Sequence, residues 1–299
     1  MELTFLGTSC MVPTKERNTP GIFLDFKGEG ILFDCGEGSQ RQMNIAGINR
    51  NRVKKVLLSH WHGDHVAGLI GLIQTLGNED RSATLTIYGP AGTKERLNHL
   101  MQAVAFDLRV NITVHELKPK GVERFFENKE YALECVSLQH SVPCLGFSFI
   151  EKERLRINMQ KAKAAGLKEG PLLGKLQAGQ AVTVQKKTIR PEDVSYKVAE
   201  KKLTIILDTE ETDEIIQLAK DADLLIIEAT YTSAAEEKAE QYRHLTAKQA
   251  ALIAQRANVK RMIMTHFSQR YKIVDEFLEE AQTYFPESSC AYDFMKVNL

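Results

Sequence analysis

The sequence predicts an α/β protein, and three observations lead to this fold class. Short apolar runs bounded by turn residues recur along the 299 residues, and amphipathic helical segments lie between many of them. Hydrophobic residues make up 43% of the chain and charged residues 26%, as in ordinary globular proteins. One basic segment, residues 151–201, interrupts the alternation of strands and helices. We therefore expect one layered domain with an insertion.

The predicted strands are short, and several are almost continuously apolar, which is typical of sheets covered on both faces. In order along the chain, they are Leu3–Leu6, Ile22–Phe26, Ile31–Phe33, Val53–Leu58, Thr84–Tyr88, Ile112–Val114, Leu133–Leu138, Leu203–Leu207, Leu224–Ile227 and Met262–Met264. The predicted helices have apolar residues at helical spacing. They are Val66–Leu76, Thr93–Ala105, Thr212–Lys220, Thr246–Ala257 and Val274–Phe285.

Charge is distributed unevenly along the chain. The formal net charge is zero, so no global basic excess points to nucleic acid. Residues 151–201, however, contain 12 Lys and Arg against 6 Asp and Glu, a local excess of +6. Such a run is by default a solvated surface, and it is also suited to binding phosphates.

The cysteines and the chain's hydropathy indicate a cytoplasmic protein. The five cysteines are odd in number, scattered and without a CxxC pair, which favours free thiols in a reducing compartment. The start, MELTFLGTS, reads as a strand and a turn, without the basic and apolar regions of a signal peptide. No run approaches the roughly 18 apolar residues of a membrane-spanning helix, so we expect no membrane association.

The stretch SHWHGDHVAG, residues 59–68, concentrates metal-ligand residues. His60 and His62 are two positions apart, so on an extended backbone their side chains point the same way and can coordinate one ion. After the turn at Gly63, Asp64 and His65 project towards a second position. Imidazole and carboxylate ligands without thiolate suit Zn²⁺, with Mn²⁺ or Fe²⁺ as lesser candidates. Two such ions activate a bridging water and hold both sides of an in-line displacement.

Four ligands cannot complete two ions, so further ligands should follow later strands. His140, Asp208 and His266 are the candidates, and Asp208 is suited to bridge because a carboxylate has two oxygens. The isolated His99 and His115 fit a structural role instead. The pattern predicts a dinuclear site with two Zn²⁺ per chain, or Mn²⁺ in their place.

The motif H-x-H-x-D-H resembles that of the metallo-β-lactamase fold, and a longer series of motifs is similar to ribonuclease Z, the tRNA 3′-processing endonucleases, in their short form. The series is LGTS at 6–9, PTKERN at 13–18, LFDCGEGSQRQ at 32–42, SHWHGDH at 59–65, HSVPCLGF at 140–147, GPLLGKL at 170–176, DT at 208–209, EATY at 228–231, HLTAKQAA at 244–251 and THFSQRY at 265–271. The resemblance implies an αββα four-layer sandwich. Residues 1–299 would form this single domain, with residues 151–201 as a protruding exosite arm.

The resemblance also implies a role for each site residue. His60, His62 and His140 would hold one zinc ion; Asp64, His65 and His266 the second; and Asp208 would bridge. Asp64 would also act as the general base, and His244, oriented by Glu228, would donate a proton to the leaving 3′ oxygen. The chain departs from the common family pattern at Leu207, where many members have glycine, and at Ile227, where many have histidine.

Substrate contacts are implied at two places. Ser268, Arg270 and Tyr271 lie beside a metal ligand and would contact substrate phosphates, although a rim salt bridge and partial burial are an alternative for Arg270 and Tyr271. In the arm, the family's glycine-proline motif is matched by Gly170, Pro171 and Gly174, followed by Lys175. The arm would clamp the tRNA elbow and, in a homodimer, serve the partner's active site. Its phosphate attraction would come from Lys161, Lys163, Lys168, Lys175, Lys186 and Lys187.

Three functions are compatible with these residues. The first is a zinc-dependent endoribonuclease that cuts precursor tRNA after the discriminator nucleotide, leaving a 3′ hydroxyl on the tRNA and a 5′ phosphate on the trailer. The second is another hydrolase of the same fold, such as a small-molecule phosphodiesterase, arylsulfatase or lactonase, which would need no basic arm. The third is a non-catalytic RNA-binding module, against which the complete set of ligands and the Glu228–His244 pair argue.

Overall fold

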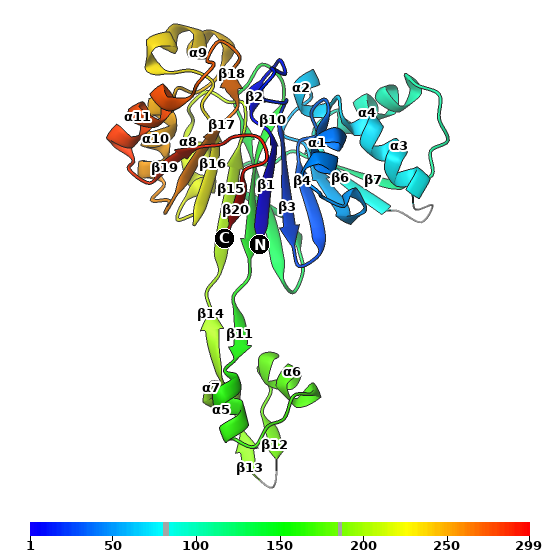
Figure 1. Cartoon of the computed structure of the whole chain (residues 1–299), viewed down its shortest axis with the longest axis vertical. Helices are drawn as coiled ribbons and strands as arrows, with labels where there is room; N and C mark the ends of the chain where they lie inside the picture. Colours follow the sequence, from blue (N-terminus) through cyan, green and yellow to red (C-terminus); the bar gives the residue numbers. More distant parts are fainter. Residues whose placement is uncertain (80–83, 185–186) are drawn as a thin grey trace.

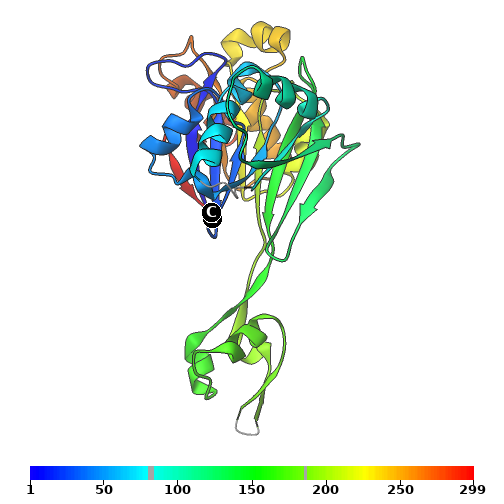
Figure 2. The same cartoon turned by 90° about the vertical axis from the view of Figure 1, so that its right-hand side faces the viewer.

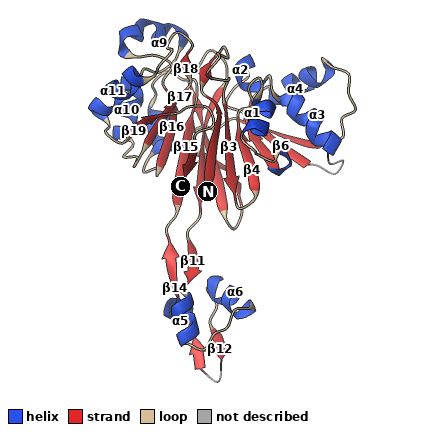
Figure 3. Cartoon of the chain, viewed as in Figure 1, coloured by secondary structure: helices blue, strands red, loops and turns tan. Residues whose placement is uncertain are grey.

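The molecule is a four-layer sandwich in which two seven-stranded sheets pack face to face and helices cover both outer surfaces (Figures 1 and 3). This architecture is that of a computed structural model, which describes residues 1–79, 84–184 and 187–299. The αββα arrangement expected from the resemblance is therefore confirmed. The two ends of the chain meet beside the first sheet (Figure 1).

The first sheet has the strand order β20-β1-β3-β4-β5-β6-β7. Its strands β4 to β7 run parallel, and the others pair antiparallel. The bounds are β1 Glu2–Gly7, β3 Gly21–Phe26, β4 Glu29–Phe33, β5 Val53–Leu57, β6 Thr84–Pro90, β7 Asn111–Leu117 and β20 Lys296–Asn298.

The second sheet has the order β19-β17-β16-β15-β10-β9-β8. Here β15, β16, β17 and β19 are parallel, whereas β8, β9, β10 and β15 pair antiparallel. The bounds are β8 Glu123–Glu127, β9 Tyr131–Leu138, β10 Cys144–Glu151, β15 Lys201–Ile206, β16 Leu224–Glu228, β17 Met262–Thr265 and β19 Ser288–Cys290. A short parallel pair, β2 Ser9–Cys10 and β18 Phe267–Ser268, lies at one end of the sandwich.

Helices α1, α3 and α4 cover the first sheet, and α8, α10 and α11 cover the second. In β16, Leu224 and Ile226 face the space between the sheets, while Leu225 and Ile227 face the helices. This explains why the strand is continuously apolar. The helices of the sandwich are α1 Ser39–Ile45, α2 Gly63–Val66, α3 Leu69–Glu79, α4 Thr93–Gln102, α8 Asp213–Ala219, α9 Glu236–Tyr242, α10 Ala247–Arg256 and α11 Asp275–Tyr284, with single 3₁₀ turns at Arg50–Arg52 and Ser233–Ala235.

All ten predicted strands are present, but the sequence analysis did not single out β10. All eight of its residues are buried, because it lies between two strands and under helix α8. The predicted helix Val66–Leu76 is wrong in one respect, since the chain forms α2 and α3 with a break between them. The reason is Gly68: a Cβ atom there would lie 2.1 Å from the carbonyl oxygen of Gly36, so the backbones touch at this point.

The basic segment leaves the sandwich as an extension of two central strands. β10 ends and β15 begins at the pair Glu151 and Lys201, and the chain between them forms a two-stranded stalk and a small tip (Figures 1 and 2). The stalk is β11 Arg154–Ile157 with β14 Ser195–Val198. The tip contains α5 Met159–Ala164, α6 Pro171–Gln177, β12 Val182–Val184, β13 Lys187–Ile189 and α7 Pro191–Val194.

The tip of the arm has a small apolar core of its own. Ala162, Leu167, Leu176, Val182, Ile189 and Val194 are buried together there. Five of the lysines predicted to attract phosphates, Lys161, Lys163, Lys168, Lys175 and Lys187, are exposed, and Lys186 lies outside the described residues. The arm therefore carries its positive charge on the surface of a folded unit. No helix in the described ranges has the length and apolar character needed to cross a membrane.

Candidate metal centre and its cleft

Seven histidine and aspartate side chains converge at the end of the sandwich opposite the arm. They come from loops that follow β5, β9, β15 and β17 and from the short helix α2. The carboxyl ends of the parallel strands β5, β15 and β17 meet at this edge, which places residues far apart in sequence side by side. The residues are His60, His62, Asp64, His65, His140, Asp208 and His266.

The first half of the cluster contains His60, His62, His140 and Asp208, whose ligand atoms all lie within 4.8 Å of one another. His62 turns its Nδ1 atom inward, 3.0 Å from Nε2 of His60 and 3.3 Å from Nε2 of His140. The three imidazoles thus face one point. This is the set that the sequence analysis assigned to one ion.

The second half contains Asp64, His65 and His266, again within 4.8 Å of one another. Oδ2 of Asp64 lies 3.4 Å from Nε2 of His65 and 3.7 Å from Nε2 of His266. Asp208 lies between the halves: its Oδ2 is 3.5 Å from Nε2 of His60, and its Oδ1 is 3.1 Å from Nε2 of His266. One carboxylate therefore reaches both groups, as expected of a bridging ligand.

The donor atoms of the cluster fit divalent cations. Within the described part of the chain, Nε2 of His65, Nε2 of His266 and Oδ1 of Asp208 are buried without a hydrogen-bond partner. Such atoms are costly to bury unless a cation satisfies them. Burial disfavours the charged form of Asp208, but the neighbouring His266 and His65 outweigh it and hold the pKa of Asp208 well below its usual range. The cluster thus favours ionised carboxylates, which is the form that binds metal.

Asp34, directly after β4, orients two of the imidazoles through contacts on the side of the ring that faces away from the cluster. Its Oδ2 atom lies 2.6 Å from Nδ1 of His65 and accepts a 2.6 Å hydrogen bond from the Ser59 hydroxyl. The same hydroxyl is 2.9 Å from Nδ1 of His60. These contacts at Nδ1 leave Nε2 of both histidines directed at the cluster, as a metal ligand requires.

Glu228, at the end of β16, orients the imidazoles of His244 and His266 through contacts at their Nδ1 atoms. Its Oε1 atom lies 2.9 Å from Nδ1 of His244, and its Oε2 accepts a 2.6 Å hydrogen bond from the Thr230 hydroxyl. That hydroxyl is 3.1 Å from Nδ1 of His266. Burial would lower the pKa of His244, but the charge of Glu228 and the hydrogen bond to it raise that pKa instead. The contact with Glu228 therefore favours the protonated form of His244 beside the cluster.

A third support acts on His140 through Arg243. The carbonyl oxygen of Arg243 lies 3.1 Å from Nδ1 of His140, and the Arg243 guanidinium donates a 2.8 Å hydrogen bond to the His140 carbonyl oxygen. Because His244 follows Arg243 directly, the imidazole of His244 and one half of the cluster are fixed by the same loop.

Backbone strain is concentrated at this end of the molecule. Nine non-glycine residues in the described chain have positive φ, a conformation that L-residues rarely adopt. Five of them belong to the cluster or its immediate surroundings. They are Met11, Asp34, Asp208, Arg243 and His266. At Asp208 the φ angle is 31°, so the backbone is strained directly after the buried Leu207.

The cluster lies at the base of a cleft of about 850 Å³. Ser268 and Arg270 line the cleft, as expected for substrate-binding residues. Tyr271 is not among the lining residues: its hydroxyl accepts a 3.2 Å hydrogen bond from the amide of Thr232, and its ring packs on Phe277. Tyr271 therefore supports the loop. The other predicted substrate residues, Gly170, Pro171, Gly174 and Lys175, lie at the start of α6 and along it, at the tip of the arm.

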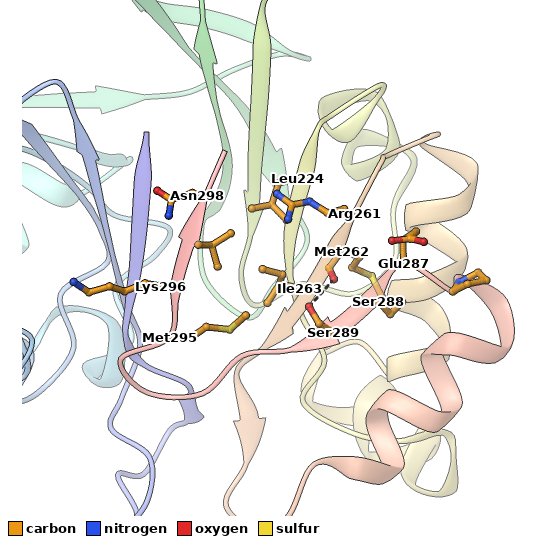
Figure 4. Close-up of a pocket in the computed structure, with 12 residues that line it drawn as sticks. Leu224, Arg261, Met262, Ile263, Glu287, Ser288, Ser289, Met295, Lys296 and Asn298 are labelled. Atoms are coloured by element: carbon orange, nitrogen blue, oxygen red, sulfur yellow. Dashed lines mark hydrogen bonds between the residues drawn. The ribbon is translucent and has the colours of Figure 1, made fainter.

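A second cavity, of about 350 Å³, lies between the C-terminal strand β20 and the first residues of β16 and β17 (Figure 4). It is at the end of these parallel strands that faces away from the cluster. Arg261, Glu287 and Lys296 are its charged residues, and histidine is not among its lining residues. The residues that line this cavity form no metal-ligand group, whereas the cleft above the histidines lies over one, so the cleft is the candidate functional site.

Comparison with known proteins identifies the family of the chain. Residues 1–159 match the family model described as anti-Pycsar protein Apyc1, and residues 175–267 match that of the beta-lactamase superfamily domain. A ribonuclease Z from Methanothermobacter thermautotrophicus is 43% identical over 300 residues, covering 100% of this chain and 97% of the relative. The chain belongs to the ribonuclease Z family.

Further relatives agree with this family. A ribonuclease Z from Archaeoglobus fulgidus is 38% identical and covers 100% of this chain and 97% of its own length. The crystal structure of the short form of human tRNase Z superposes with a TM-score of 0.75 at 28% identity, covering 100% of this chain and 99% of the human one. The metallo-beta-lactamase fold protein YhfI of Bacillus subtilis shares the fold, with a TM-score of 0.69, 18% identity and coverage of 99% and 98%.

The sequence analysis missed the residues that support the ligands. Asp34, Ser59 and Thr230 lie within the quoted motifs LFDCGEG, SHWHGDH and EATY, but none was assigned a role. The available signal was a polar residue at the carboxyl end of a predicted strand, as at Asp34 and Thr230. Arg243 gave no such signal, because its contribution includes a backbone carbonyl group.

Proposed function

We propose that this protein is a zinc-dependent endoribonuclease that removes the 3′ trailer from precursor tRNA, cutting after the discriminator nucleotide. The observation that carries the proposal is the convergence of seven metal-ligand side chains and the Glu228–His244 pair at the base of one cleft. Membership in the ribonuclease Z family supports RNA as the substrate.

Two ions would occupy the two halves of the cluster. His60, His62 and His140 would hold the first, Asp64, His65 and His266 the second, and Asp208 both. Nitrogen and oxygen donors without thiolate favour Zn²⁺, with Mn²⁺ possible. When bound, such a pair lowers the pKa of an attacking water and neutralises charge on the phosphate.

Asp64 and His244 would move the protons of the reaction. Oδ2 of Asp64 is held by a 2.8 Å hydrogen bond from the amide of Met11, which fixes the carboxylate that would receive the proton of the water. His244 would give its proton to the leaving 3′ oxygen of the tRNA, and Glu228 would keep the imidazole charged and oriented until then. The reaction would leave a 3′ hydroxyl on the tRNA and a 5′ phosphate on the trailer.

The arm would bind the body of the tRNA. Its exposed lysines and its excess of +6 suit a phosphate backbone, and a structured RNA recognised by shape requires contacts far from the cut. The motif at Gly170, Pro171 and Gly174 lies at the start of α6 and along it, in the small folded unit at the end of the stalk, where it would contact the RNA.

A homodimer would bring arm and cleft together. Strands β10 and β15 connect the cleft end of the sandwich to the arm. β10 has eight residues, so it alone separates them by roughly 26 Å. The arm leaves the sandwich at the end opposite α2, α9 and β18 (Figures 1 and 2), and residues of these three elements line the cleft. A second copy in the opposite orientation would place an arm near each cleft. We further propose that the protein acts in the cytoplasm, in accord with its five free cysteines.

The proposal is tested with purified protein and a precursor tRNA that carries a 3′ trailer. We expect release of the trailer with Zn²⁺ or Mn²⁺, and neither chelated protein nor Asp64→Ala should cleave. Elemental analysis should find about two ions per chain, as in two-metal sites generally. Turnover of a small phosphodiester without any cleavage of precursor tRNA would instead favour a small-molecule phosphodiesterase.

A further inference from the structure

Two large and mainly apolar side chains stand exposed in the lining of the cleft. Met11 follows β2 and is 73% exposed, and Tyr242 is the last residue of α9 and is 53% exposed. Both line the cleft above the cluster. Figures 1 and 2 show β2 and α9 at the same end of the sandwich. Exposed apolar groups at a binding site usually mark a contact with an apolar part of the ligand.

The rest of the cleft is suited to phosphates. Lys238, Arg243 and Arg270 line it together with the metal-ligand residues. A nucleic acid that places a phosphate on the cluster must also accommodate the two bases attached to the neighbouring sugars. Bases stack on aromatic and apolar side chains irrespective of their identity, which suits an enzyme whose substrates differ in sequence.

Tyr242 is the aromatic residue of the cleft that is free to stack. The cleft's other aromatic residue, Tyr231, is only 8% exposed, and the Arg270 guanidinium lies 5.6 Å from the centre of its ring. Met11 has an equally specific placement. Its amide binds the carboxylate of Asp64, and its φ of 62° holds the side chain at the rim.

We propose that Tyr242 and Met11 bracket the cleavage site by stacking on the bases of the two nucleotides that flank the scissile phosphate. Tyr242 lies two residues from His244, which serves the leaving 3′ oxygen, so Tyr242 takes the base of the discriminator nucleotide. Met11 follows a different element, β2, and binds Asp64 through its amide, so Met11 takes the base of the first trailer nucleotide. This assignment rests on the proposed precursor-tRNA activity and specifies how the same cleft positions its substrate.

Abasic substrates test the assignment one base at a time. Three precursor tRNAs are compared: an unmodified one, one without the discriminator base and one without the first trailer base. On the unmodified RNA, Tyr242→Ala should reduce kcat/KM by a factor between about 5 and about 150, as for loss of one aromatic stacking partner, and Met11→Ala should reduce it by a smaller factor. Tyr242→Phe and Met11→Leu keep the stacking surface and should stay near the wild-type value.

The decisive result is that each alanine substitution no longer reduces kcat/KM when the RNA lacks the base on which that side chain stacks. Tyr242→Ala should cost little on the RNA that lacks the discriminator base but retain its full penalty on the RNA that lacks the trailer base, and Met11→Ala should show the reverse. Met11→Ala keeps the backbone hydrogen bond to Asp64, since only the amide makes it. Tyr292→Ala, at an equally exposed tyrosine that does not line the cleft, is the matched control and should behave as wild type.

The inference is overturned if both alanine variants keep the wild-type kcat/KM, if their losses are the same on all three RNAs, or if the two dependences are exchanged. Equal metal content and circular dichroism spectra would exclude misfolding as the cause of a loss. A wild-type protein that cleaves no precursor tRNA would refute the proposed function as well, whereas active wild type with base-independent variants would refute this inference alone.

Discussion

Two buried carboxylates organise the centre in the same way at the scale of single residues. Asp34 contacts His65 directly and His60 through the Ser59 hydroxyl, and Glu228 contacts His244 directly and His266 through the Thr230 hydroxyl. Each carboxylate is completely buried. Buried imidazoles whose Nδ1 atoms are engaged in this way present a fixed Nε2, so the cluster is preorganised for metal.

Asp34→Asn should weaken metal binding. The change keeps the shape of the side chain but removes the charge behind His65 and His60, and loss of such a partner typically lowers metal affinity by about 10- to 100-fold. The measurement is the metal content of the protein after equilibration with a chelator of known affinity. Asp25→Asn, at a surface carboxylate paired with Arg52, is the control and should change nothing. Equal metal retention by all three proteins would contradict this role of Asp34.

Glu228→Gln should change the pH dependence of cleavage. Burial alone lowers the pKa of His244, and Glu228 raises it, so removal of the charge must lower it. A general acid is active while protonated, and activity falls as pH rises through its pKa. The basic limb of the kcat profile should therefore move to lower pH. Glu240→Gln, at an exposed carboxylate on α9, should leave the limb in place; an unmoved limb in Glu228→Gln would argue against His244 as the acid.

The sequence predicted the ligands better than their supports. Seven ligand candidates could be named because histidine and aspartate carry their chemistry in the side chain and followed predicted strands. The roles of Ser59 and Thr230 could not be predicted. A hydroxyl group supports a ligand only through a contact that the fold creates, such as that between Thr230 and the distant His266. For Tyr271 two roles were open, contact with phosphates and partial burial, and the half-buried ring that packs on Phe277 agrees with partial burial without testing the phosphate contact.

At the scale of elements, the arm is an elongated connection between two neighbouring strands. β10 and β15 are paired as far as Glu151 and Lys201, so the sandwich would remain closed without the intervening residues. Sequence analysis could place this segment by its charge but not its internal structure, because its strands have only three or four residues and its apolar core only six buried side chains. The break between α2 and α3 was similarly invisible, since it depends on contact of Gly68 with a distant loop.

Replacement of residues 152–200 by Asn-Gly should separate binding from chemistry. A two-residue turn closes an antiparallel pair, so the shortened protein should fold and bind metal. We expect it to hydrolyse a small phosphodiester at the wild-type rate and to lose cleavage of precursor tRNA. Replacement of residues 158–194 alone by Asn-Gly, which leaves the stalk strands and closes them with a turn, should show the same loss. Unchanged tRNA cleavage in either protein would be evidence against the arm as the tRNA-binding element.

At the scale of the whole molecule, the elements that line the cleft, α2, α9 and β18, lie at the end of the sandwich opposite the arm. The fold class and the αββα layers followed from strand and helix patterns together with the resemblance. The sequence did not predict that the cluster and the arm lie at opposite ends. Their separation depends on β10 and β15, which run from the end with His140 and Asp208 to the end that carries the arm. This arrangement is the physical basis for proposing that one subunit's arm serves the other subunit's cleft.

Complementation between two inactive proteins tests this division between subunits. The protein with residues 152–200 replaced keeps its cleft, and Asp64→Ala keeps its arm. Coexpressed as a mixed dimer, the two should cleave precursor tRNA, because the arm of the Asp64→Ala subunit reaches the intact cleft. Each of the two proteins alone should fail to cleave precursor tRNA, and these separate assays are the controls. A mixture no more active than its parts would show that the arm does not act across a dimer.

The central claim is that a water molecule, activated at the histidine and aspartate cluster, attacks the phosphate and that the 3′ oxygen of the tRNA leaves. Cleavage of precursor tRNA in ¹⁸O-labelled water, followed by mass spectrometry of both products, tests it most directly. The account predicts one ¹⁸O atom in the 5′ phosphate of the trailer and an unlabelled 3′ hydroxyl on the tRNA. A 2′,3′-cyclic phosphate on the tRNA, or a trailer with a 5′ hydroxyl, would contradict it.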